Sequence, residues 1–318
     1  MSKNNRSVRW YPDFRTSLAM IMLAIAPAGA GAQNVSDLSD FASEAISPTF
    51  EEADTLIETF KESLASNDVA ALAELLGLDP MLVLDDEATI ETFVKIRDGV
   101  AELLAIEDSG RRIYLKIGRN LWPFPFPIVR DDDGNWSFDT MAGLEEIANR
   151  RIGENELEAI GTARAYIDAQ REYALQDHDG DGVLEYAQKL ISSEGQADGL
   201  YWPATLEAGI SPAGDFADES QLDAVGRGEG YFGYRFKILK SQGDNIAGGA
   251  YDYVINDNMI AGFALIAWPV SYAETGAKTF VVSHHGTVYE KDLGPATADI
   301  VAYIDRFNPD DSWEVTSD

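Results

Sequence analysis

The sequence of 318 residues contains no cysteine. This absence excludes disulfide bonds, thiol catalysis, cysteine-ligated zinc, iron–sulfur clusters and attachment of a lipid through an N-terminal cysteine. Only three histidines are present, which nearly excludes a histidine-rich metal site. Basic residues are also scarce, because 24 lysines and arginines stand against 55 aspartates and glutamates and give a net charge of −31. Nucleic acids and anionic membrane surfaces are therefore poor partners for the protein as a whole.

Long apolar runs are missing as well. The runs at residues 18–26 (LAMIMLAIA) and 262–270 (GFALIAWPV) have nine residues each. A helix needs about 20 apolar residues to cross a bilayer, so neither run predicts a permanent membrane span.

The first apolar run has the surroundings of an export signal. It follows a basic segment and precedes the small-residue sequence at residues 30–32 (AGA), which has the A-x-A form of a signal-peptidase site. We expect a signal peptide over residues 1–32, a flexible lead-in over residues 33–47, and a periplasmic or secreted protein. An uncleaved N-terminal anchor is the alternative. The basic side chains of the signal are Lys3, Arg6, Arg9 and Arg15.

Apolar spacing predicts a mixed N-terminal domain over residues 48–148. Residues 53–64, 68–76 and 90–104 have the spacing of helices. Residues 112–117 then alternate between apolar and polar side chains, and residues 126–130 and 136–139 form a predicted hairpin, which together indicate a small antiparallel sheet.

A second domain is expected over residues 149–318. It opens with a long helix over residues 154–176 and ends with a helix that begins at Pro295. The predicted fold class is α+β, with N-terminal helices and a small antiparallel sheet, then a long helix packed on an antiparallel sheet of about four strands. The second half resembles the head of a pilin or pseudopilin in this arrangement. The four strands are predicted at residues 234–238, 262–268, 279–282 and 287–290.

Residues 177–188 (DHDGDGVLEYAQ) form the one segment with a chemical signature. Calcium prefers six to eight oxygen ligands, and a loop with carboxylates at alternate positions can surround one ion. Asp177, Asp179 and Asp181 occupy positions 1, 3 and 5 of such a loop, and Gly182 occupies the sharp-turn position 6.

The remaining predicted ligands are the Val183 carbonyl at position 7, Glu185 at position 9 and Gln188 at position 12, where a bidentate glutamate is usual. Because no pair of a nucleophile and a base is found nearby in the sequence, we predict a structural calcium ion rather than a catalytic one. The alternative is an ordinary connection whose aspartates cap and turn the backbone. The predicted metal ligands are Asp177, Asp179, Asp181, Val183, Glu185 and Gln188.

Other candidate sites have weaker patterns. His284 and His285 are adjacent at a predicted hairpin tip, so we expect exposed side chains that point apart, and we expect His178 to be exposed too. The glycines of residues 226–230 precede a predicted strand rather than a helix, which argues against a phosphate-binding loop. The acidic residues 131–133 are typical of a hairpin turn. No serine lies in a G-x-S-x-G motif, and no catalytic residue is assigned.

Two segments combine aromatic residues with proline, at residues 121–127 (LWPFPFP) and 198–203 (DGLYWP). Such segments can line a binding groove or pack in a core or between domains, and we expect packing.

Seven co-linear motifs resemble the bacterial domain-of-unknown-function family 2950. The match extends over nearly the whole chain that follows the signal. It implies an exported envelope or secreted protein, and it transfers no activity, substrate, cofactor or catalytic residue. The motifs are residues 150–156 (RRIGENE), 165–170 (AYIDAQ), 186–188 (YAQ), 198–203 (DGLYWP), 248–250 (GGA), 262–269 (GFALIAWP) and 288–295 (VYEKDLGP).

These observations predict an exported, non-enzymatic module that binds or assembles with an envelope protein or polymer. One structural calcium ion is part of this prediction. A hydrolase of an envelope polymer, with paired carboxylates in a groove between the domains, is the alternative. A third hypothesis is an acidic protein that binds many cations weakly.

Overall fold

The computed structural model describes residues 38–84, 87–206, 208–214 and 217–317. The predicted signal peptide over residues 1–32 and the start of the predicted lead-in lie outside the described residues. The rest of the lead-in differs from the expected flexible segment, because Leu38–Phe41 forms a 3-10 helix and the Phe41 side chain is buried. The Phe41 carbonyl also accepts a hydrogen bond from the N–H of Asp79, at 2.9 Å. An apolar anchor therefore fixes this segment.

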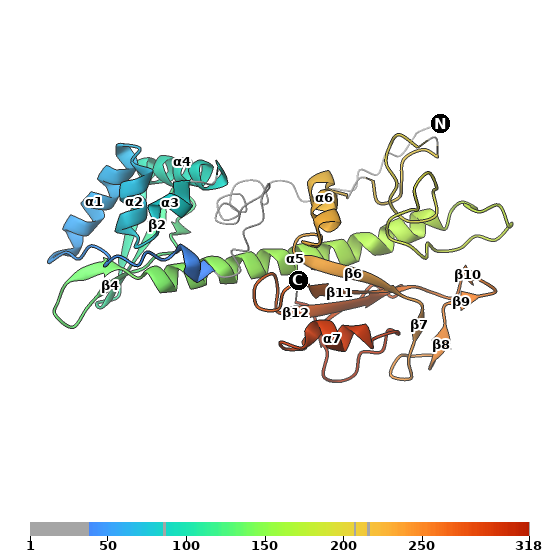
Figure 1. The fold of residues 1–318 in the computed structure, drawn as a ribbon. Coiled ribbons are helices and arrows are strands. Elements are labelled where there is room, and N and C mark those ends of the chain that lie inside the picture. The colour runs from blue at the N-terminus through green and yellow to red at the C-terminus, as the bar shows by residue number, and fades with distance from the viewer. Residues whose placement is uncertain (1–37, 85–86, 207, 215–216, 318) are drawn as a thin grey trace, which may run out of the picture. The chain divides into compact units, whose positions relative to one another are not determined.

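The chain divides into two compact units, residues 1–151 and 152–318 (Figure 1). The boundary falls inside one helix, α5 (Thr140–Tyr173). Each unit has its own cluster of buried apolar side chains. Both units combine helices with antiparallel sheets, which confirms the predicted α+β class.

The N-terminal unit contains a five-stranded antiparallel sheet in the order β1-β2-β4-β5, with β3 paired to β2. Pro80 begins a short helix that the apolar spacing did not predict. The side chain of Asp79 accepts the N–H of Met81 at 2.8 Å and so caps this helix. The helices are α1 (Ala53–Ala65), α2 (Val69–Leu75), α3 (Pro80–Leu84) and α4 (Glu87–Glu102), and the strands are β1 (Leu104–Asp108), β2 (Arg112–Ile117), β3 (Trp122–Pro123), β4 (Ile128–Arg130) and β5 (Trp136–Phe138).

Aromatic rings form the centre of this unit. Phe60 of α1 is fully buried, and its ring centroid lies 5.2 Å from that of Phe124 and 5.7 Å from that of Phe138. Trp122 and Phe126 are buried beside them. The aromatic-proline segment at residues 121–127 thus packs in the core, as expected.

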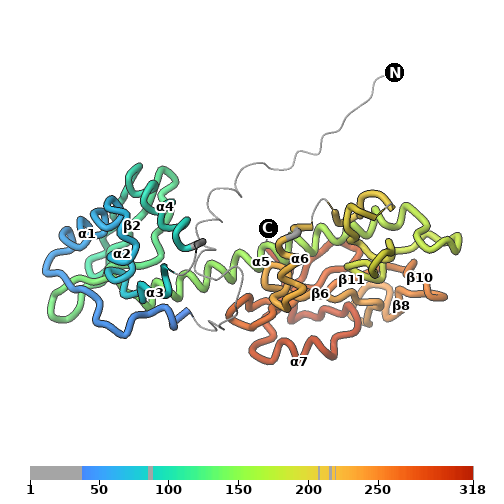
Figure 2. Tube along the Cα trace, turned by 45° about the horizontal axis from the view of Figure 1, so that its top comes forward, coloured from blue at the N-terminus to red at the C-terminus, as the bar shows by residue number. Residues whose placement is uncertain are grey.

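The C-terminal unit is built on a five-stranded antiparallel sheet in the order β14-β13-β12-β11-β6, where about four strands were expected. Figures 1 and 2 both show α5 along one face of this sheet and α7 along the other. The interior strand β11 is therefore apolar along most of its length. The other helices are α6 (Glu219–Arg227) and α7 (Thr297–Ala302), and the strands are β6 (Tyr234–Leu239), β7 (Ser241–Gln242), β8 (Tyr251–Asp252), β9 (Val254–Ile255), β10 (Asn258–Met259), β11 (Ala264–Pro269), β12 (Lys278–Ser283), β13 (Val288–Asp292) and β14 (Glu314–Val315).

Helix α5 begins at Thr140, well before the expected start at residue 154. The side chain of Asp139 accepts the N–H of Ala142 at 3.1 Å and caps the helix at this earlier position. Gly143 lies in its first turns, where a methyl group would collide with the Phe126 ring, so close packing accounts for a residue that otherwise weakens helices. Within the described residues, no helix combines the length and apolar character needed to cross a membrane.

Candidate metal centre after helix α5

The predicted metal loop leaves the C-terminal end of α5, where aromatic side chains hold it. The ring of His178 stacks on that of Tyr173 with centroids 3.9 Å apart, and its centroid lies 5.9 Å from that of Trp202. The His178 Nε2 atom also lies 3.1 Å from the Tyr173 carbonyl oxygen. His178 is thus half-buried rather than exposed as expected, and it anchors the start of the loop.

A buried amide holds the other end of the loop. The Gln170 side chain is fully buried in α5. Its Oε1 accepts the N–H of Ala187 at 2.8 Å, and its Nε2 donates to the Ala187 carbonyl at 2.8 Å and to the Tyr166 hydroxyl at 3.0 Å. The motifs at residues 165–170 and 186–188 therefore meet in space. Both ends of the loop are fixed to the same helix.

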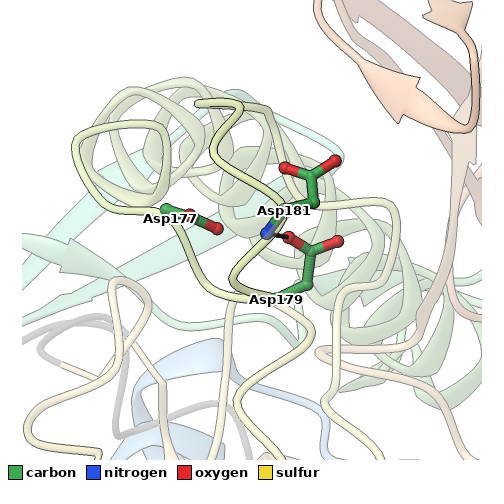
Figure 3. Close-up of side chains that lie close together, drawn as sticks. All are labelled: Asp177, Asp179 and Asp181. Atoms are coloured by element: carbon green, nitrogen blue, oxygen red, sulfur yellow. Dashed lines mark hydrogen bonds between the residues drawn. The ribbon is translucent and has the colours of Figure 1, made fainter.

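Three carboxylates converge between these anchors (Figure 3). One carboxylate oxygen from each of Asp177, Asp179 and Asp181 lies within 4.8 Å of the others, and all three side chains are exposed. Asp177 accepts the N–H groups of Gly180 and Gly182 at 2.7 and 2.9 Å. Both glycines have positive φ, +80° and +87°, a conformation that residues with a Cβ rarely adopt. The loop therefore curls around its first aspartate.

The loop is electrostatically negative. The N–H groups of Gly180 and Gly182 stabilise the carboxylate of Asp177 and lower its pKa. Burial first, and then the charges of Glu185, Asp198 and Asp179, raise the pKa of the Tyr173 hydroxyl to about 12. A cation placed among the three aspartates would reduce the repulsion between their charges.

Val183 and Glu185, the predicted ligands at positions 7 and 9, both form hydrogen bonds in the structure. The Val183 N–H donates to Asp181 Oδ1 at 2.7 Å, which closes a turn at the end of the aspartate cluster. The Glu185 carboxylate accepts the N–H of Met259 in β10 at 2.9 Å. Glu185 therefore joins the loop to the β9–β10 hairpin, and it lies outside the group of three converging carboxylates.

Gln188, the predicted ligand at position 12, has both ends of its amide occupied. Its Nε2 donates to the Asp257 carbonyl at 2.6 Å, and its Oε1 accepts from Lys240 Nζ at 2.9 Å. The structure thus brings Asp177, Asp179 and Asp181 together, and it directs Gln188 toward the hairpin turn.

The local spacing gave no sign of Asn258, which also belongs to this site. Its Nδ2 donates to Asp181 Oδ2 at 2.8 Å, across 77 residues of sequence. Asn258 lies on β10, beside the Met259 that bonds Glu185. The β9–β10 hairpin therefore contacts the loop on the side of its third aspartate, where an amide oxygen is a further potential cation ligand.

The paired histidines differ from the sequence expectation. Their rings lie together, with centroids 4.1 Å apart, rather than pointing apart. His284 packs edge-on against Tyr253 and Phe263, and its Nδ1 is buried with no hydrogen-bond partner in the described residues. Gly262 leaves the space for this ring, since a Cβ there would lie 2.8 Å from Nδ1. His284 is thus a packed ring in the turn between β12 and β13, whereas His285 in the same turn is exposed as expected.

We expect the stability of the protein to fall in mild acid because of His284. Burial, and secondly the nearby His285, lowers the pKa of His284. The unfolded chain then binds the proton more readily, so stability decreases as the pH falls through about 6.5, the ordinary histidine value, and levels off below the lowered value. Melting temperatures of His284→Phe between pH 7 and pH 5 should decline less than those of the unchanged protein. Tyr303→Phe, at a side chain that is 88% exposed, is the control, and an equal decline in the His284 variant would contradict the prediction.

Comparisons with known proteins identify a family for this chain and no individual relative. A family described as "Protein of unknown function (DUF2950)" matches residues 47–316. No curated protein matches the chain, and no solved structure does.

Proposed function

This chain belongs to the DUF2950 family of proteins of unknown function, and from that starting point we propose that it is an exported, non-enzymatic binding or assembly module with one structural calcium ion. The observation that carries the proposal is the convergence of Asp177, Asp179 and Asp181 within 4.8 Å. The ion would stiffen the connection between α5 and the β9–β10 hairpin. The surface that binds an envelope protein or polymer would then be held in one shape.

The character of the ligands supports calcium over other cations. Hard oxygen ligands suit calcium and magnesium, and calcium accepts the irregular geometry of a flexible loop more readily. Because the bidentate glutamate at position 12 is replaced by a Gln188 bonded elsewhere, we expect weak binding, with a Kd of about 10⁻⁴ to 10⁻³ M. Affinities of this order suit modules outside the cell, where calcium is abundant. The proposed location rests on the export signal pattern at residues 1–32.

The carboxyl groups support a binding role over hydrolysis. A general acid in a glycosidase-type mechanism needs a carboxyl group whose pKa is raised toward neutrality. Every resolved pKa shift among carboxyl groups of the described residues is downward, which favours the ionised form. These groups are Asp177, Asp198, Asp218, Glu229, Asp305 and Asp310.

Calcium should stabilise the protein and magnesium should do so much less. With about 5 mM calcium we expect a gain of about 1–2 kcal/mol and a rise in melting temperature of roughly 2–6 °C. The stacking of His178 on Tyr173 and its contact with Trp202 should also make tryptophan fluorescence respond to the ion. Thermal unfolding in EDTA, calcium and magnesium, followed by a calorimetric titration, measures both effects.

Asp179→Asn is the sharpest variant for this test. Its side chain keeps an oxygen that can accept the N–H of Asp181, so the fold should remain while the calcium response is lost. The matched control is Asp132→Asn, the same change in the exposed acidic turn at residues 131–133, which should leave the response intact. A calcium response that persists in Asp179→Asn, or an equal response to magnesium, would refute the calcium centre.

A further inference from the structure

Strand β1 forms an open edge of the sheet in the N-terminal unit. It pairs with β2 on one side, and among the described residues no strand lies on its other side. The Ser109 N–H donates to the Arg112 carbonyl of β2 at 2.8 Å. Since hydrogen-bonding groups alternate in direction along an antiparallel strand, the N–H and C=O groups of Leu104, Ile106 and Asp108 point to the open side. These groups are able to pair with a further strand.

The buried face of the sheet continues onto this edge, where it is only partly covered. Ile106 lies directly opposite Leu115 of β2, so both side chains are on the same face. Leu115 is fully buried, whereas Ile106 is 52% exposed. Leu104, which lies opposite the buried Ile117, is half-buried and packs against the core. A strand beside β1 would therefore cover Ile106 and extend the core.

We infer that β1 of a second copy of this chain pairs antiparallel with β1 across a two-fold axis at Ile106. This register places Ile106 opposite Ile106 of the second copy, and Leu104 opposite its Asp108. Every outward-pointing N–H and C=O group of these residues then has a partner, and the two isoleucine side chains contact each other over the axis. The surface is thus self-complementary, as a two-fold interface requires. It lies apart from the aspartate loop, so its test does not depend on calcium.

The charged side chains on the other face of the sheet fit the same register. Lys116 of β2 lies opposite Ala105 and forms an ion pair with Glu107 of its own copy at 2.6 Å. Glu107 of the second copy would lie on the other side of Ala105, and only the small alanine side chain would separate it from Lys116. Residues 104–117 contain three basic and two acidic side chains. Because charges farther than about 8 Å are screened at physiological salt, the acidity of the rest of the chain opposes this contact only weakly.

Sedimentation velocity of the full-length protein at physiological salt tests the pairing. One pair of five-residue strands is a small interface, so we expect a weak, reversible dimer that forms as the protein concentration rises to about 0.5 mM. Ile106→Lys places two like charges opposite each other at the axis and should weaken association by about tenfold or more. Ile300→Lys is the matched control, because Ile300 is 39% exposed on α7 of the other unit. A monomer at every concentration, or equal association of the two variants, would overturn the inference.

Cysteine crosslinking tests the register, because the chain has no cysteine of its own. In the proposed dimer the Cα atoms of the two Ile106 residues would be about 5.5 Å apart, within the range that a disulfide bridges. Ile106→Cys should therefore crosslink two copies when oxidised glutathione is the oxidant, and it tests the surface even if Ile106→Lys does not fold. Ala105→Cys is the control, because two Ala105 residues would lie diagonally and farther apart. Equal or faster crosslinking of Ala105→Cys would overturn the register.

Discussion

Replacing Phe60 by alanine is expected to destabilise the N-terminal unit by about 3–5 kcal/mol. The Phe60 side chain is fully buried, and its ring centroid lies 5.2 and 5.7 Å from those of Phe124 and Phe138, which also contact each other. Truncation removes the apolar area and the ring contacts, and it leaves a void in a core that cannot close around it. Chemical denaturation at 25 °C measures the loss of unfolding free energy.

The separate cores of the two units predict where this loss appears. Phe60 belongs to the buried cluster of the N-terminal unit, and the C-terminal unit has a cluster of its own. Hydrogen exchange should therefore quicken in β2 and β5 and stay unchanged in β11 and β12. Tyr303→Ala removes an aromatic ring that is 88% exposed, so it should change stability by less than about 0.5 kcal/mol. Faster exchange in β11 and β12 would show that both units unfold together.

Local periodicity explains why much of the fold could be predicted. In α1 the helical spacing selected Leu56, Phe60 and Leu64, and all three are buried. In β2, which the alternation of residues 112–117 predicted as a strand, the apolar side chains of Ile113 and Leu115 are buried. Such patterns depend only on neighbours within one or two turns. The early start of α5 was missed because its first turns contain Gly143, whose place depends on the distant Phe126 ring.

The candidate site shows the same division between local and distant information. The alternate spacing of Asp177, Asp179 and Asp181 predicted a cluster, and the structure brings the three together. The partners that shape the cluster come from elsewhere in the chain. Asn258 reaches Asp181 across 77 residues, and Gln170 reaches Ala187 across 17 residues. Such pairs cannot be predicted from a single sequence, because residue spacing carries no information about contacts between distant elements.

Gln170→Met is the change expected to affect the loop most, since it removes the clamp at the end of the loop. A methionine of similar size fills the space but leaves the buried N–H and carbonyl of Ala187 without partners. Each unsatisfied buried group costs about 1–3 kcal/mol, so we expect a loss of about 2–5 kcal/mol. Gln196→Met is the matched control, because Gln196 is exposed in the next connection and its replacement should change little.

The same variant tests whether the Gln170 clamp also affects calcium binding by the loop. If Gln170 holds Ala187 in place for the aspartate cluster, then Gln170→Met should also weaken calcium binding, because the ion must order a loop with one free end. Denaturation in EDTA gives the loss of the clamp alone, and calorimetric titration of the folded variant gives the effect on the ion. A loss below about 1 kcal/mol in EDTA would mean that water replaces the amide at Ala187. A large loss with unchanged calcium affinity would mean that the clamp serves only the packing of α5, and that the anchors His178 and Glu185 are sufficient to shape the loop.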